Sequence, residues 1–257
     1  MESIEEPMVA LMTPLCQVAP KWITMYFGER EVHGIVSLET KIQLQCQGFS
    51  GILIILDVAI SNGFGDPSSH LSVNVKSPMA EGYVRIDKSI LTPGLAMEWE
   101  IKLFLVNLHH LLNNLLSRGY IHRNITSEHI MIKRETMSPM LIDFSGIFEL
   151  IPDYPLNRIP RHSDTPEPFK APNPRARMLV DGENLMSHQL GQLLFFMMTA
   201  SYWPKSVNYK WPIFLSSQSK KFVLSLLREK SRGTFRKVIT TAFYKEGLAR
   251  VTEYFDV

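Results

Sequence analysis

Cysteine is scarce in this sequence. Its 257 residues include two cysteines, Cys16 and Cys46, which are far apart and form no CxxC pair. A structural zinc site needs four ligands, usually cysteine and histidine at short spacings, so the cysteine-rich zinc folds are excluded. Sparse cysteine is also typical of proteins in reducing compartments. We therefore expect a cytoplasmic protein, with the nucleus as a second location.

The sequence also lacks a dominant charge and a long apolar run. Lysine and arginine number 27 against 25 aspartate and glutamate, and a net charge of +2 does not indicate nucleic-acid binding. The most apolar stretch, residues 190–200, is shorter than the roughly 20 residues that a membrane helix needs. The first 16 residues are acidic and contain Pro14, unlike a secretory signal. We expect neither a nucleic-acid nor a membrane partner.

What the sequence does contain is a change of pattern near Pro93. Before it, short apolar runs alternate with turn residues, which is typical of strands. After it, Leu105, Leu108, Leu112 and Leu115 recur at helical spacing up to Gly119, and the chain is predicted to be helical from Leu185 onward. Residues 151–174 are rich in proline and are predicted to form an extended loop. The predicted strands cover residues 22–27, 35–38, 42–46, 51–60 and 70–75. The fold class that follows is α+β.

A series of motifs begins at the end of the predicted leucine-rich helix. His122-Arg123-Asn124 opens a loop that ends at His129, an apolar hairpin covers 130–142, and Asp143-Phe144-Ser145 follows. This order resembles the catalytic loop H-R-D-x-x-x-x-N and the D-F-G motif of the protein kinase superfamily. Three later stretches resemble further kinase motifs in the right order: residues 164–173 (T-P-E…A-P-E), 187–199 (the buried helix S-L-G…T) and 232–235 (R-P-T-F).

The resemblance implies a bilobal kinase-like fold, with a reduced β-rich N-lobe over residues 1–76 and a mainly helical C-lobe over 77–257. It implies ATP and Mg²⁺ as cofactors, with Asp143 as the metal and nucleotide ligand. In the N-lobe, Gly34 and Val36 are what remains of a glycine-rich loop, and Lys41 is the best candidate for the strand lysine. The stretch after Lys41 is too short for the usual regulatory helix.

Three positions of the loop depart from the family pattern. Asn124 stands where the catalytic aspartate would be, and an amide cannot act as a base. Thr126 stands where many serine/threonine kinases have a lysine against the transferred phosphate. His129 replaces the asparagine that binds a second Mg²⁺, an ion that prefers oxygen ligands. His122 and Arg123 are retained, and we interpret them as residues that hold the loop in place.

The resemblance therefore implies a pseudokinase, a catalytically deficient protein that regulates or scaffolds a partner, and a chain that binds neither ATP nor Mg²⁺ is compatible with it. The alternative is a divergent active serine/threonine kinase that uses Asp143 for Mg²⁺ and another group as base. A further alternative is a degenerate or alternatively spliced kinase product whose small lobe does not fold alone.

A finer resemblance involves the residues on both sides of the loop. Residues 118–124 and 127–132 are similar to the STRAD group of STE20-related pseudokinases, whose loop contains G-Y-V-H-R-S…S-H-I-L-I. That resemblance implies two partners, an LKB-type serine/threonine kinase and an MO-type armadillo-like scaffold. STRAD proteins end in W-E-F, whereas this sequence ends in Glu253-Tyr254-Phe255-Asp256-Val257 and lacks the tryptophan.

Overall fold

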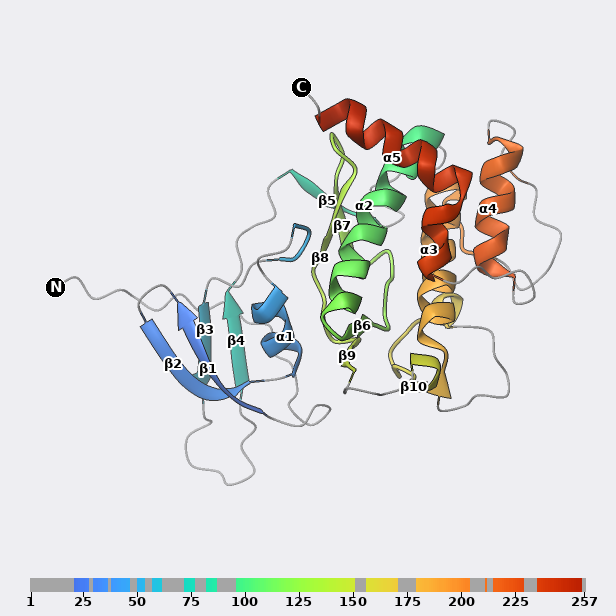
Figure 1. Ribbon diagram of the computed structural model, residues 1–257. Helices are drawn as coiled ribbons and strands as arrows, with labels where there is room; N and C mark the ends of the chain where they lie inside the picture. The colour runs from blue at the N-terminus through green and yellow to red at the C-terminus, as the bar shows by residue number, and fades with distance from the viewer. Residues whose placement is uncertain are drawn as a thin grey trace. The chain divides into compact units, whose positions relative to one another are not determined.

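The computed structural model divides the chain into two compact units, Met1–Glu81 and Gly82–Val257 (Figure 1). Within the described part of the chain, no helix is both long and apolar enough to cross a membrane. The structure describes residues 21–27, 30–36, 38–46, 50–53, 57–61, 72–76, 82–86, 96–150, 156–170, 179–203, 211, 215–228 and 235–255.

The first unit contains two antiparallel strand pairs and a short helix. Strand β1 (Lys21–Phe27) pairs with β2 (Arg30–Val36), and β3 (Asp57–Ser61) pairs with β4 (Ser72–Lys76). The strand predicted at 22–27 is thereby confirmed, as are residues 72–75 of the strand predicted at 70–75, whose residues 70 and 71 lie outside the described part. The run predicted at 51–60 is a strand from Asp57, while residues 54–56 lie outside the described part. Of the strand predicted at 35–38, residues 35 and 36 belong to β2.

Helix α1 (Leu38–Cys46) corrects the prediction of a strand at 42–46. The alternation of Ile42, Leu44 and Cys46 suggested a strand, but Ile42 and Cys46 are also four residues apart, which places them on one helical face. Both are fully buried, whereas Leu44 is partly exposed. The helix also carries Lys41, so this lysine does not lie in a strand as the sequence predicted.

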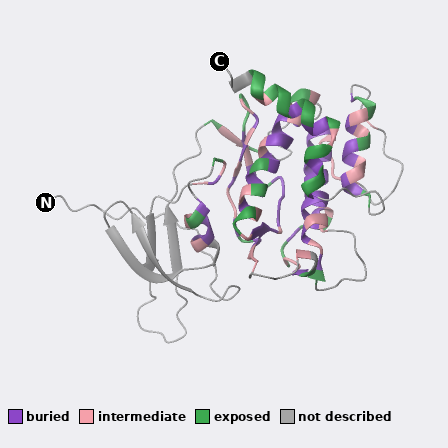
Figure 2. Cartoon of the chain, viewed as in Figure 1, coloured by how far each residue is buried: buried purple, intermediate pink, exposed green. Residues whose placement is uncertain are grey.

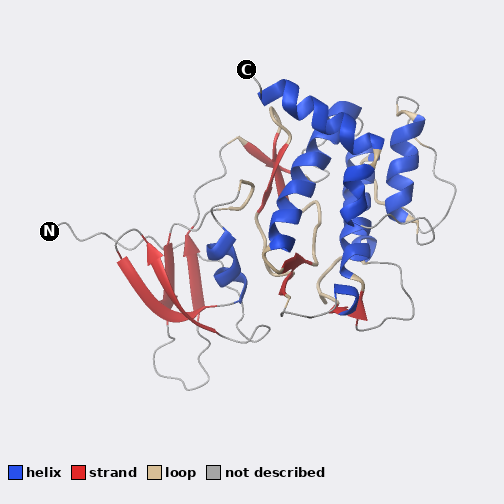
Figure 3. Ribbon diagram, viewed as in Figure 1, coloured by secondary structure: helices blue, strands red, loops and turns tan. Residues whose placement is uncertain are grey.

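The second unit is mainly helical (Figure 3). Helix α2 (Glu98–Ser117) packs against helix α5 (Ala242–Phe255), and helix α3 (Gly182–Thr199) packs against helix α4 (Ser217–Leu227). The predicted leucine-rich helix is confirmed in α2. It ends where predicted, because Gly119 has a φ of 81° and turns the chain into the next strand.

Short strands connect these helices. A three-stranded antiparallel sheet has the order β5 (Tyr83–Arg85), β7 (Ile130–Lys133), β8 (Ser138–Leu141), and its β7–β8 pair is the predicted hairpin. Strand β6 (Tyr120–His122) pairs with β9 (Ile147–Glu149). The predicted extended loop is, where described, made of two 3₁₀ turns, η2 (Leu156–Arg158) and η3 (Glu167–Phe169), and strand β10 (Ile159–Pro160), which pairs with β11 (Leu179–Val180).

Helix α3 forms the centre of the second unit's core. Figure 2 shows it buried along most of its length, and all residues from Leu185 to Met198 are buried. An apolar helix without a polar face is stable only when other elements surround it. The two buried glutamines in α3, Gln189 and Gln192, therefore need hydrogen-bond partners inside the protein.

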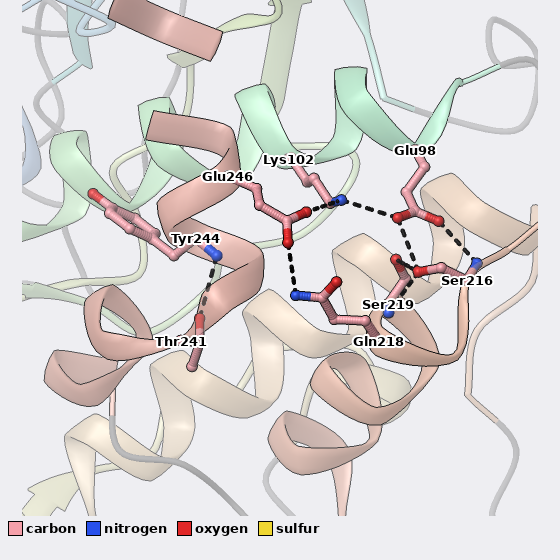
Figure 4. Close-up of polar contacts among 8 residues, drawn as sticks. All are labelled: Glu98, Lys102, Ser216, Gln218, Ser219, Thr241, Tyr244 and Glu246. Carbon is pink, nitrogen blue, oxygen red and sulfur yellow. Dashed lines mark hydrogen bonds and ion pairs between the residues drawn. The ribbon is translucent and has the colours of Figure 1, made fainter. Parts of the chain in front are cut away.

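A polar network ties α2 to α4 and α5 (Figure 4). Lys102 Nζ lies 3.0 Å from Glu98 Oε1 and 2.6 Å from Glu246 Oε2. The backbone N–H and the hydroxyl of Ser216, the residue before α4, both donate to the Glu98 carboxylate at 2.9 Å. Burial alone would raise the pKa of Glu98, but the hydrogen bonds from Ser216, Ser219 and Lys102 lower it to about 2. Glu98 is therefore ionised throughout the physiological range.

Candidate functional site

The loop from His122 to His129 begins at the end of β6 and leads into β7. Its backbone is held close to the turn after Asp143, because the Arg123 N–H donates to the Gly146 carbonyl at 3.0 Å. A Cβ atom on Gly146 would lie 2.5 Å from the Asn124 Cβ, a distance that real structures do not tolerate. Glycine at 146 therefore permits the close approach of the two segments.

His122 connects the loop to the Asp143 segment as a neutral side chain. Its Nδ1 accepts a hydrogen bond from the Asn124 N–H at 3.2 Å, so Nε2 carries the proton and donates to the Asp143 carbonyl oxygen at 2.8 Å. The side chain is 1% exposed, and burial lowers its pKa to about 4. His122 thus has both ring nitrogens in use for backbone contacts.

Arg123 holds the loop against two other segments. Its Nε donates to the Gly146 carbonyl at 3.0 Å, and Nη1 donates to the Pro160 carbonyl at 2.9 Å. Its guanidinium lies over the Phe148 ring, 5.1 Å from the centroid. Burial lowers the pKa of Arg123 to about 10, which leaves it charged at neutral pH. These contacts agree with the interpretation that His122 and Arg123 hold the loop in place.

Gln189 of α3 supports the same loop, and the sequence did not identify it. Its Oε1 accepts the Ile125 N–H at 3.1 Å, and its Nε2 donates to the Arg123 carbonyl at 2.7 Å. The Thr165 hydroxyl donates to that same carbonyl at 3.2 Å. An amide suits this task, because one side chain supplies both a donor and an acceptor. The available sequence signal was a glutamine within an apolar helix.

Asn124 and Thr126 occupy two of the predicted catalytic positions, and both are buried. They are 2% and 1% exposed, and the Asn124 Oδ1 and Thr126 Oγ1 atoms have no hydrogen-bond partner among the described residues. Neither side chain carries a charge. The neighbouring residues His122, Arg123 and Ile125 are held by hydrogen bonds, whereas these two side-chain oxygens have no described partner.

His129 and Asp143 form an ion pair. Nε2 of His129 lies 3.1 Å from Asp143 Oδ2, and Nδ1 lies 3.0 Å from the Asn124 carbonyl oxygen. Because a carbonyl oxygen accepts but cannot donate, Nδ1 carries a proton, and the contact of Nε2 with a carboxylate is attractive when Nε2 carries one too. Both ring nitrogens of His129 are therefore in contact with acceptors of the same chain.

The second oxygen of Asp143 is engaged as well. The Ser145 N–H donates to Asp143 Oδ1 at 2.7 Å. Burial raises the pKa of Asp143, but hydrogen bonds from Ser145 and the neighbouring His129 and His122 outweigh it and lower the pKa below its ordinary value. Asp143 is thus a carboxylate at neutral pH, with both oxygens in contact with donors of its own chain.

This donor set does not suit Mg²⁺. The ion prefers six oxygen ligands, whereas residue 129 offers an imidazole nitrogen that already contacts the carboxylate. Among the described residues, no group of three or more histidine, cysteine, aspartate or glutamate side chains could hold a metal.

The predicted site residues are divided between the two units. Asn124, His129 and Asp143 are brought together, with Thr126 buried in the same loop. Gly34 and Val36 lie in β2, opposite Ile23 and Lys21 of β1, and Lys41 lies in α1. Their assignment to nucleotide binding stays a prediction.

Among the comparisons with known proteins, only the comparison of structures gives a match. No family model matches the sequence, and no curated protein matches it. The structure is similar to that of the kinase PK-1 of Cydia pomonella granulovirus, with a TM-score of 0.60 and 13% sequence identity over 87% of this chain and 95% of that chain. At this identity the likeness concerns the fold and not the chemistry. The chain has an α+β, protein-kinase-like fold.

Proposed function

We propose that the chain is a pseudokinase, a protein with a kinase-like fold that acts by binding a partner protein and does not transfer phosphate. The observation that carries the proposal is Asn124, a buried amide at the loop position where a kinase needs a carboxylate; its oxygen has no partner among the described residues. Its neighbours His122, Arg123 and Ile125 are all held by hydrogen bonds. The loop conformation is therefore maintained, but no carboxylate is present to act as the base.

The energetic argument concerns the transition state. Phosphoryl transfer depends on positioning and on electrostatic stabilisation of the charge that develops. An uncharged amide at 124 and an uncharged hydroxyl at 126 together remove several kcal/mol of that stabilisation, which lowers the rate on the order of 10³-fold or more.

The second candidate function is a divergent active kinase. Asp143 favours it, because this residue is retained and ionised and carries the charge that a metal–nucleotide complex would require. In that case ATP and Mg²⁺ are cofactors and another group supplies the base.

A phosphotransfer assay separates these candidates. Purified wild-type chain is incubated with γ-labelled ATP, Mg²⁺ or Mn²⁺ and a general protein substrate, beside the Asp143→Asn variant. We expect equal incorporation from both, at background level. Incorporation by the wild type that the Asp143→Asn substitution abolishes would overturn the pseudokinase proposal and establish the active kinase. The variant also controls for co-purifying kinases, whose activity it would not remove.

For the partner, we propose a STRAD-like role as activator of a serine/threonine kinase held together with an armadillo-like scaffold. The support is the short resemblance of residues 118–124 and 127–132. Mixing the purified chain with an LKB-type kinase and an MO-type scaffold should give a complex in size-exclusion chromatography and a more active kinase. If the chain elutes alone in every mixture, the STRAD-like role is excluded while the pseudokinase proposal stands.

A further inference from the structure

The polar atoms of the His129–Asp143 pair are all in contact with partners from the chain itself. Four polar atoms matter here, the two ring nitrogens of His129 and the two carboxylate oxygens of Asp143. Each contacts a partner from the same short stretch of chain: Nε2 meets Oδ2 at 3.1 Å, Nδ1 meets the Asn124 carbonyl at 3.0 Å, and Oδ1 accepts the Ser145 N–H at 2.7 Å. The pair is complete without any ligand.

We propose that the His129 side chain occupies the place of the divalent cation on Asp143, so that the chain excludes metal, and metal-bound nucleotide, from this carboxylate. This inference rests on the proposed function and deepens it, because it assigns the loss of metal binding to one side chain. A cation on the Asp143 carboxylate would have to displace His129 from Oδ2. It would then lie beside an imidazole whose Nε2 has lost its partner and whose Nδ1 still contacts the Asn124 carbonyl.

Burial and anchoring make this displacement unfavourable. The His129 and Asp143 side chains are 19% and 31% exposed, so water screens the pair less than it screens a surface ion pair. Rotation of the ring away from Asp143 would also break its contact with the Asn124 carbonyl. Even then, the site would gain no oxygen ligand from residue 129, which Mg²⁺ needs.

The substitution that tests the proposal is His129→Asn. It removes the imidazole and supplies an amide oxygen at the same position. The matched control is His110→Asn, which makes the same change at an exposed position of α2. The probe is Mn²⁺, added with and without ATP, and the readout is the electron paramagnetic resonance signal of free Mn²⁺, which falls as the ion binds.

We expect the wild type and His110→Asn to leave this signal unchanged, and His129→Asn to bind Mn²⁺ about tenfold or more tightly, a change of about 1.4 kcal/mol. Adding Asp143→Asn to His129→Asn should abolish the gain. His129→Ala, which removes the imidazole without adding a ligand, should give a smaller gain and serves as a second variant if His129→Asn does not fold.

Two results would overturn the proposal. One is wild-type binding of Mn²⁺ at Asp143, shown by its loss in Asp143→Asn. The other is a folded His129→Asn or His129→Ala that binds no better than the wild type. The Mn²⁺ signal does not measure phosphate transfer. A His129→Asn chain that binds Mn²⁺·ATP but transfers nothing therefore supports both proposals, whereas transfer by the wild type contradicts the proposed function separately.

Discussion

Two sets of residues in the same loop have opposite surroundings. The anchoring set, His122, Arg123 and Ile125, makes hydrogen bonds to the Asp143 segment, to Pro160 and to Gln189 of α3. The other set, Asn124 and Thr126, is equally buried, but its side-chain oxygens have no partner among the described residues. Both sets lie within five consecutive residues, 122–126.

This difference separates what maintains the fold from what performs chemistry. Loss of an anchoring contact would leave a buried backbone group unsatisfied and would lower stability, whatever the protein does. A side chain that faces a substrate contributes nothing to stability when no substrate is bound. Under the proposed function, a chain that does not transfer phosphate would keep the first set and could lose the second.

The largest effect is expected when a residue that holds the loop is replaced. In Gln189→Ala the Ile125 N–H loses its partner, while the Arg123 carbonyl keeps the longer hydrogen bond from Thr165. We expect the free energy of unfolding to fall by about 3 kcal/mol, from the unsatisfied N–H and the cavity. Urea unfolding measures the loss, and hydrogen exchange at Ile125 should become faster.

Gln192→Ala is the matched control, since Gln192 is also buried in α3 but accepts from the Trp203 N–H and not from the loop. It should lower stability without accelerating exchange at Ile125. Equal exchange in the two variants would show that Gln189 does not anchor the loop.

A second prediction asks whether anchors outside the loop behave in the same way. The Glu98 carboxylate joins α2 to α4, and its pKa is about 2 against an ordinary 4.5. Glu98→Gln should lower the free energy of unfolding by about 2 kcal/mol at pH 7. Because the folded pKa is the lower one, Glu98 contributes its stability above about pH 4.5 and loses it as the pH falls towards 2. The difference between variant and wild type should therefore shrink over that interval in urea titrations.

Glu253→Gln provides the comparison for Glu98. The Arg250–Glu253 pair is more than half exposed, so its loss should change the free energy of unfolding by less than about 0.5 kcal/mol. A Glu98→Gln difference that stays constant down to pH 2 would mean that the carboxylate charge is not what stabilises the three helices.

The smallest expected effect compares two neighbouring hydroxyls, both 1% exposed. The Ser127 hydroxyl lies 2.7 Å from the Tyr202 hydroxyl, whereas that of Thr126 has no described partner. Ser127→Ala should cost about 1 kcal/mol, and Thr126→Val should be neutral or stabilise by up to about 1 kcal/mol. Thermal unfolding of both variants measures the contrast. A clear destabilisation by Thr126→Val would place Thr126 among the anchors.

The amino-acid pattern was sufficient for several elements and misleading for one. The leucines of α2, the β7–β8 hairpin and the turn at Gly119 were predicted because each depends on neighbouring residues. Helix α1 was missed because a spacing of two residues and a spacing of four both fit Ile42, Leu44 and Cys46. Ile42 and Cys46 are both buried, as one face of a helix allows, and Lys41 belongs to the same helix.

By itself, the sequence determined the order of the elements, the α+β class and the position of a kinase-like loop, because local spacing and side-chain chemistry specify these. Tertiary structure decided which side chains contact one another. Gln189 reaches Ile125 from 64 residues away, and Asp143 lies 14 residues after the His129 imidazole that contacts it. The physical reason is that a hydrogen bond or an ion pair depends on distance in space, which the fold sets and spacing along the chain does not.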